Sequence, residues 1–216
     1  MDYTQKDFET MTFKFTHSIR ASHQPVLYEM LRSTTGPVIE FGSGEHSTAL
    51  IHEMCGGTRK IITLDDNEDW LNRYRPKFES NTHEFIYVPK PPRVAFQNGD
   101  HWHKILADDK IKNVAWDLVF IDQNPWLARY YTLLALNTAA KYVVLHDSDY
   151  FFRADVFGTC EVGRQMLKEK KCVFDTLFKT YKIYPPTAPW PTTSPPTLLG
   201  SNIVSEFPKI EYANYK

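Results

Sequence analysis

The stretch Pro37–Thr48 constrains the fold of this chain more than any other. It opens with a short apolar run, residues 37–41, whose β-branched members favour a buried strand. It breaks at Gly42-Ser43-Gly44 and resumes over residues 47–54 in a pattern typical of a helix, which Gly56-Gly57 ends. The sequence therefore predicts a strand, a glycine turn and a helix. Such a turn lets a ligand approach the backbone and meet free N–H groups at the helix start.

A second apolar run, Ile61–Leu64, ends in Asp65-Asp66. An acid at the tip of the second strand is placed to hydrogen-bond ribose hydroxyls. A dinucleotide fingerprint requires a third glycine where Ser47 stands, which argues against NAD as the ligand. An ordinary α/β turn that binds nothing is the alternative, but it does not explain why the turn, the helix start and the acid coincide.

Glu40 stands two residues before Gly42-Ser43-Gly44, and this pattern resembles motif I of the class I S-adenosylmethionine (SAM)-dependent methyltransferases, acid-x-Gly-x-Gly. The resemblance spans about residues 37–202. It implies a Rossmann-like α/β fold, with a doubly wound, mostly parallel seven-stranded sheet and an antiparallel C-terminal strand. It also implies SAM as cofactor, bound by Glu40, Gly42, Ser43, Gly44, Ser47, Asp65 and, near the adenine, Asp100.

Length and composition fit one domain over residues 1–216, with an N-terminal cap segment (1–35), a Rossmann-like core (37–202) and a proline-rich loop (185–196). The net charge of −1 gives no electrostatic argument for nucleic acid. Three cysteines, an odd number, favour a reduced protein. The polar N-terminus does not resemble a signal peptide, and no run approaches the ~20 apolar residues of a membrane span. We therefore expect a cytoplasmic protein.

Hydrophobic patterning predicts the remaining elements of the sheet and its covering helices. The expected strands after the second are 83–89, 116–122, 141–147, 173–178 and 197–202. One helix is expected to start near Pro25, and three more are expected over 67–76, 125–140 and 158–170.

Acids collect at the carboxyl ends of four predicted strands: Glu40, Asp65, Asp122 and Asp147. Ligands of open parallel sheets bind along that edge. Acids scattered at random would not gather there, so this placement indicates an active site independently of any resemblance.

The acids after strands four and five carry a second resemblance, to metal-dependent small-molecule O-methyltransferases of the catechol type and their sugar-modifying relatives. Asp122 and Asp147 match the carboxylates that hold a divalent cation in that family, which implies Mg²⁺ or Mn²⁺ here. Ser148 replaces the family's amide, and Pro125 stands where the family has a lysine. The alternative is a metal-free reaction in which His146, or one carboxylate, takes the proton.

These observations predict an O-methyltransferase that acts on a hydroxyl of a sugar, such as a glycan deoxyhexose like rhamnose, or of a similar small acceptor. The predicted catalytic residues are Asp122, His146 and Asp147, although His146 can equally be a buried structural histidine. We expect residues 17–24 and the loop around Trp190 to border the acceptor pocket. Methylation of a protein or nucleic-acid nitrogen, or a non-catalytic cofactor-binding module, are the alternatives.

Overall fold

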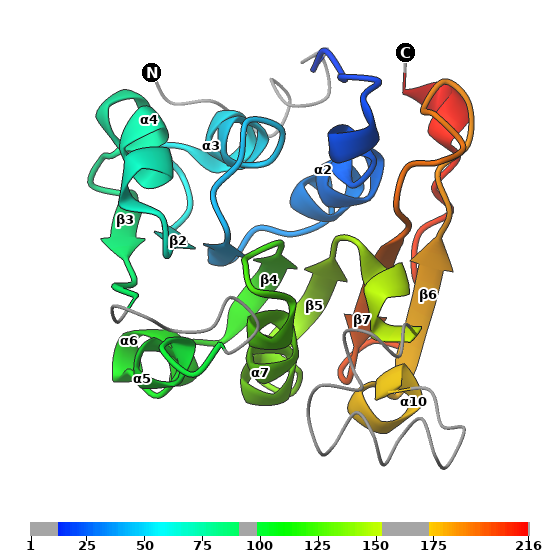
Figure 1. Ribbon diagram of the computed structural model, residues 1–216. Helices are drawn as coiled ribbons and strands as arrows, with labels where there is room; N and C mark the ends of the chain where they lie inside the picture. Colours follow the sequence, from blue (N-terminus) through cyan, green and yellow to red (C-terminus); the bar gives the residue numbers. More distant parts are fainter. Residues whose placement is uncertain (1–12, 91–98, 153–172, 216) are drawn as a thin grey trace.

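The computed structural model describes residues 13–90, 99–152 and 173–215, and its seven strands form one sheet in the order β3-β2-β1-β4-β5-β7-β6 (Figure 1). Strands β1 to β5 run parallel, while β7 is antiparallel to both β5 and β6. The predicted fold class is therefore confirmed. The strands are β1 Val38–Phe41, β2 Ile61–Asp65, β3 His83–Tyr87, β4 Trp116–Ile121, β5 Ala140–Leu145, β6 Thr180–Tyr184 and β7 Thr197–Ser201.

Helices cover both faces of the sheet (Figure 1). On one face lie α2 Gln24–Arg32, α3 Thr48–Cys55 and α4 Glu68–Phe78, and on the other α5 Trp102–Leu106, α6 Asp109–Lys112, α7 Trp126–Leu136 and α10 Val173–Leu177. Side chains of β1 alternate between the two cores: Ile39 and Phe41 pack with α5 and α7, whereas Val38 packs with α2 and α3. Both faces of the strand are buried, which explains its continuous apolar run.

The predicted strand at 173–178 is wrong, because Val173–Leu177 forms α10 and the edge strand is Thr180–Tyr184. Val173, Phe174 and Leu177 are buried together, at the spacing of one helix face. Their β-branched and aromatic composition favoured a strand, but the period of their burial is helical. The predicted helix over 158–170 lies outside the described residues.

Three short 3₁₀ helices, Ile19–Ala21, Ser148–Phe152 and Tyr212–Asn214, lie in the segments around the core. The N-terminal segment, the proline-rich loop and the C-terminal tail pack on one another through an aromatic cluster. Rings of Phe15, Trp190 and Tyr215 meet edge to face at centroid distances of 4.9–6.3 Å. Tyr212 adds a hydrogen bond from its hydroxyl to the Ser22 carbonyl (2.9 Å). Three segments distant in sequence thereby form a cap next to α2.

Strand order reverses between β1 and β4, so the carboxyl ends of these strands flank a topological switch point. This edge is where the glycine turn after β1 and the polar residues after β4 and β5 meet. Among the described residues, no helix is long and apolar enough to cross a membrane.

Candidate active site

The glycine turn after β1 packs against the end of β4. Gly42 has φ +90°, and a Cβ atom there would lie 2.6 Å from the backbone nitrogen of Gln123, so only glycine fits. At Gly44 a Cβ atom would meet only the Ser47 hydroxyl, at 3.2 Å. Gly42 is therefore required by the fold, whereas Gly44 leaves space for a ligand.

Glu40 lies beneath this turn and is completely buried. Its carboxyl accepts hydrogen bonds from the hydroxyls of Thr48 (3.1 Å) and Thr63 (2.8 Å), and Thr48 in turn accepts one from the Gly44 backbone N–H. Burial raises the pKa of Glu40 to about 8, in opposition to these hydrogen bonds. The predicted cofactor residue Glu40 thus acts on the turn through Thr48 and does not line the cavity described below.

Asp65, at the tip of β2, holds the other side of the turn. One carboxylate oxygen accepts from the backbone N–H and the hydroxyl of Ser43 (2.8 and 2.7 Å), and the other accepts from the Asn67 N–H (2.8 Å). Burial raises the pKa of Asp65, against these hydrogen bonds. Oδ2 therefore has both acceptor sites filled, and Oδ1 has one lone pair left for a ribose hydroxyl.

Asp100, the residue predicted to lie near the adenine, is an exposed residue whose carboxylate lies 3.7 Å from His103. Its neighbour His101 is the inward-facing member of this loop, and it pairs with the buried carboxylate of Asp66 at 2.8 Å. Lys90 contacts the other oxygen of Asp66, also at 2.8 Å. The sequence analysis did not single out Asp66, because its partners lie 24 and 35 residues away.

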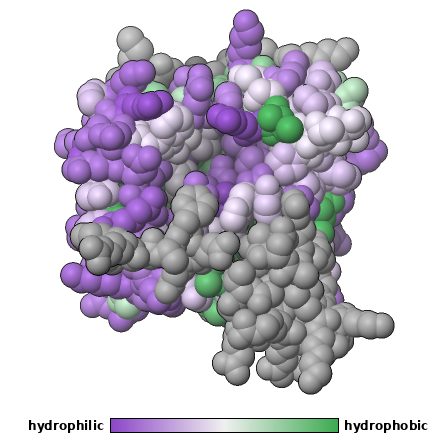
Figure 2. All heavy atoms as spheres, viewed as in Figure 1, coloured by the Kyte–Doolittle hydropathy of each residue, from purple (hydrophilic) through white to green (hydrophobic). Residues whose placement is uncertain are grey.

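A cavity of about 780 Å³ opens over the carboxyl ends of β1, β4 and β5. The face of the molecule seen in Figure 2 is hollowed near its middle, where mostly hydrophilic residues gather. Six predicted site residues line the cavity: Ser43, Gly44, Ser47, Asp122, His146 and Asp147. The N-terminal segment contributes Ile19, Arg20 and His23, and the proline-rich loop contributes Thr193–Pro196. Trp190 itself is buried in the aromatic cluster of the cap.

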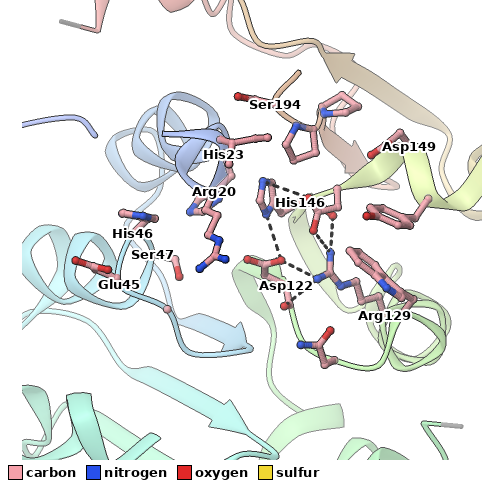
Figure 3. A pocket seen from close by; sticks show the side chains of 18 of the residues that line it. Arg20, His23, Glu45, His46, Ser47, Asp122, Arg129, His146, Asp149 and Ser194 are labelled. Atoms are coloured by element: carbon pink, nitrogen blue, oxygen red, sulfur yellow. Dashed lines mark hydrogen bonds and ion pairs between the residues drawn. The ribbon is translucent and has the colours of Figure 1, made fainter. Parts of the chain in front are cut away.

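The structure brings Asp122, His146 and Asp147 together, and Figure 3 shows His146 beside Asp122. His146 Nδ1 lies 3.2 Å from Asp122 Oδ1, and its Nε2 lies 3.6 Å from Asp147 Oδ1. The imidazole is almost fully buried, and Asp147 has a left-handed backbone (φ 52°), a conformation that occurs preferentially at functional sites. The ends of β4 and β5 therefore place a histidine between two carboxylates.

Arg129 of α7 forms ion pairs with the carboxylates of both Asp122 and Asp147. Its guanidinium lies 2.8 Å from Asp122 Oδ1 and 3.0 Å from Asp147 Oδ2. Its remaining N–H groups donate to the backbone carbonyls of Gln123, His146 and Asp122 at 2.8–3.1 Å. All five donors of this buried guanidinium are satisfied. Arg129 thus joins the ends of β4 and β5 and neutralises part of their negative charge.

These neighbours shift the titration of the centre. Burial alone would raise the pKa of Asp122, but His146 and Arg129 hold it well below its usual range. Burial raises the pKa of Asp147 despite the same two neighbours. For His146, burial favours the neutral ring, yet the charge of Asp122 and its hydrogen bond raise the pKa. His23, which packs on His146 at a ring centroid distance of 4.5 Å, has a pKa well below its usual value because it is fully buried.

The Asp122–Asp147 pair does not fit the Mg²⁺ or Mn²⁺ ion that the resemblance implied. The guanidinium of Arg129 already bridges the two carboxylates. Ser148, which stands in place of the family's amide, is buried and donates its hydroxyl to the Pro196 carbonyl (3.2 Å). A hard divalent cation needs several oxygen ligands that are free of such partners.

Sequence reasoning missed Arg129 and His23. Arg129 lies within a helix predicted from its apolar side, and nothing local marks its contacts to residues 7 and 18 positions away. His23 precedes Pro25 at the start of α2, within residues 17–24, which were predicted to border the acceptor pocket without His23 being singled out. Its position over His146 follows from tertiary packing of the cap.

No protein-family model and no curated protein matches the chain. Solved structures do match. The O-methyltransferase from Bacillus cereus in complex with SAH aligns with a TM-score of 0.50 at 13% identity, over 83% of this chain and 79% of that one. Spermidine synthase from Thermotoga maritima aligns with a TM-score of 0.51 at 13% identity, over 85% of this chain and 60% of that one. At these identities the likeness shows a shared Rossmann-like fold, and the reaction has to be argued from the site.

Proposed function

We propose that this protein is a SAM-dependent O-methyltransferase that acts on a hydroxyl of a small acceptor, with sugars as the preferred class. The observation that carries the proposal is the cavity in which the glycine turn after β1 faces the Asp122–His146–Asp147 centre. One wall suits a nucleoside-bearing cofactor, and the opposite wall suits removal of a proton.

The cofactor wall consists of the Gly42–Gly44 turn, Ser47 and the adjoining Asp65. Asp65 Oδ1 has a lone pair for a ribose hydroxyl, and Gly44 leaves room beside the start of α3. The whole lining holds four carboxylates and two guanidiniums, at Glu45, Asp122, Asp147, Asp149, Arg20 and Arg129. This excess of negative charge favours a cationic ligand such as a sulfonium over a dinucleotide, whose phosphates are anionic.

The acceptor wall combines aromatic and polar groups near the end of β5. Trp126 and Tyr150 stack at a centroid distance of 3.7 Å with an interplanar angle of 16°. Asp149 Oδ1 is buried and has no hydrogen-bond partner among the described residues, so it is available to an acceptor hydroxyl. Asn124 lines the same wall. Tyr150 and the Arg129 guanidinium (4.0 Å) cover the Trp126 ring, so the hydrogen-bonding groups of this wall, which suit the hydroxyls of a sugar, support the choice of acceptor class.

Methyl transfer requires the acceptor oxygen, the methyl carbon and the sulfur to align, so positioning supplies much of the rate. When bound, SAM supplies a methyl group on a cationic sulfur. The acceptor oxygen bonds to the methyl carbon as the bond from that carbon to the sulfur breaks. The residues of this chain orient the two reactants and receive the hydroxyl proton as the new C–O bond forms. Asp122, His146 and Asp147 are the groups placed to receive it, and they lie on the cavity side of β4 and β5.

Incubation with methyl-labelled SAM tests the proposal. The acceptor panel contains free and nucleotide-linked sugars, a catechol, a peptide mixture and an RNA oligonucleotide. We expect label on the oxygen of a sugar or another small hydroxyl compound, and loss of that label in Asp122→Ala. Label only on peptide or RNA nitrogen would overturn the acceptor class. Binding of SAM with no transfer to any acceptor would favour a non-catalytic module.

A further inference from the structure

The hydrogen-bond directions around His146 indicate that a proton or a metal ion lies between its Nδ1 and Asp122 Oδ1. The Ser22 hydroxyl donates its only hydrogen to the Pro195 carbonyl (2.8 Å). Its oxygen therefore accepts from His146 Nε2, 3.2 Å away, and Nε2 carries a hydrogen. In a neutral ring the lone pair of Nδ1 then faces Asp122 Oδ1 at 3.2 Å. Two acceptors remain at this distance only if a second proton or a metal ion joins them.

His23 supplies a second unsatisfied group beside this position. Its side chain is 2% exposed, and neither ring nitrogen has a hydrogen-bond partner of normal geometry among the described residues. The His46 backbone carbonyl lies near the His23 ring but raises the pKa of His23 only weakly. Leaving a buried polar atom unpaired costs about 1–3 kcal/mol. A buried imidazole with both nitrogens unpaired indicates a ligand at this point.

We propose that His23, Asp122 and His146 bind one divalent ion of the later first-row transition metals, with Zn²⁺ as the reference ion. One ligand atom from each residue lies within 4.8 Å of the others. Two imidazoles and one carboxylate are the donor set of many zinc and iron sites that keep open positions for substrate. Mg²⁺ prefers a shell of oxygens, which this set does not provide. All three ligands line the cavity, so the open positions face the acceptor space.

The surrounding contacts orient these ligands as metal sites require. Ser22 Oγ and Asp147 Oδ1 lie 3.2 and 3.6 Å from Nε2 of His146, so the N–H that does not bind metal has partners. Tyr212 fixes Ser22 from the C-terminal tail. The described contacts of the Asp122 carboxylate go to Oδ1, so an ion beside His146 Nδ1 would have Oδ2 as a further oxygen of the same carboxylate.

Arg129 sets a limit on this site. Its charge opposes a dication, and the carboxylates of Asp122 and Asp147 outweigh it by one negative charge. We therefore expect weaker binding than the same donors would give without an arginine. A bound ion would act on the acceptor hydroxyl as a Lewis acid, and this role rests on the proposed function. Binding of the ion itself does not, so it is measured without SAM or acceptor. Because the ion would occupy Asp122 and His146, Asp147 would be the group of the centre left to receive the proton.

Metal titration of the full chain tests the proposal. Protein stripped with a chelator is titrated with Zn²⁺, and with Co²⁺ as a spectroscopic probe whose visible absorption reports nitrogen and oxygen ligands. We expect one equivalent of saturable binding that excess Mg²⁺ does not displace. His23→Ala and His146→Ala should each weaken it at least about tenfold, while His103→Ala, which removes an exposed histidine, should leave it unchanged.

His23→Gln retains side-chain volume and replaces His23→Ala if circular dichroism shows that the alanine variant does not fold. No saturable Co²⁺ or Zn²⁺ binding would overturn the proposal, and so would binding that survives both His23 substitutions. Histidine ¹⁵N chemical shifts give a direct readout: a protonated Nδ1 of His146 in the presence of excess Zn²⁺ assigns the position to a proton. SAM binding measured in the stripped protein shows separately whether the proposed function holds.

Discussion

The two walls of the cavity differ in how they are held. The cofactor wall, between β1 and β2, is fixed by hydrogen bonds from Ser43 to Asp65 and from Thr48 to Glu40, with no ion pair at these side chains among the described contacts. The acceptor wall, at the ends of β4 and β5, depends on a buried guanidinium and a histidine between carboxylates. The first wall suits binding of a ligand by shape and hydrogen bonds. The second concentrates charge where a proton has to leave, so substitutions in the two walls should separate binding from turnover.

The largest expected effect is on turnover. Asp122→Ala and His146→Ala should each lower kcat by about a hundredfold or more and leave SAM affinity within about twofold, because they act where the proton is lost. Asp117 lies near the amino end of the same strand and accepts the backbone N–H groups of Thr35 and Gly36. Asp117→Ala should therefore lower stability without lowering kcat of the folded protein. Equal losses of kcat in Asp117→Ala and Asp122→Ala would contradict the assignment.

The next comparison separates two glycines of one turn. Gly42→Ala places a Cβ against the Gln123 backbone at φ +90° and should lower the free energy of unfolding by roughly 2–4 kcal/mol, as seen in chemical denaturation. Gly44→Ala meets only the flexible Ser47 hydroxyl, so stability should change by less than about 1 kcal/mol while SAM binding weakens. A turn that tolerates alanine at Gly42 would mean that the loop does not pack on β4 as described.

Glu40 makes the cofactor wall sensitive to pH. Its pKa is about 8 in the folded protein and 4.5 for an ordinary glutamate, so the folded protein binds more protons than the unfolded chain between these pH values. Protonation of Glu40 therefore stabilises the folded state. Its contribution to the free energy of unfolding is complete below pH 4.5 and is lost as pH rises through 8. Wild type should lose about 2 kcal/mol more between pH 6 and 9 than Glu40→Gln, which cannot ionise. Identical pH profiles for the two proteins would show that Glu40 ionises normally.

Local pattern predicted much of the fold and the cofactor wall. The glycine turn, the acid after β2 and the nearly continuous apolar run of β4 are each encoded within a few residues. Elements at the edge of the sheet were harder to predict. The helix α10 has only five residues, too few to show a helical hydrophobic period, and its β-branched and aromatic residues favour a strand. The predicted position of Asp100 illustrates the same limit, since its neighbour His101 is the residue that faces inward.

The acceptor wall was predicted only in part, for a physical reason. Strand-end residues Asp122, His146 and Asp147 follow from topology, because parallel strands end at one edge. Arg129 and His23 reach that edge from α7 and the N-terminal segment, and their contacts span 6 to 123 residues of sequence. Such contacts depend on packing of the whole domain, so no short motif marks them.

Calorimetric titration of SAH and NAD into wild type, Asp65→Ala and Asp122→Ala tests the central claim most directly. Wild type should bind SAH and not NAD. Asp65→Ala should weaken SAH binding by roughly 1–3 kcal/mol through the lost ribose hydrogen bond, and Asp122→Ala should bind it almost as wild type does. Binding of NAD alone, or an equal loss of SAH affinity in the two variants, would contradict the division of the cavity into a cofactor wall and an acceptor wall.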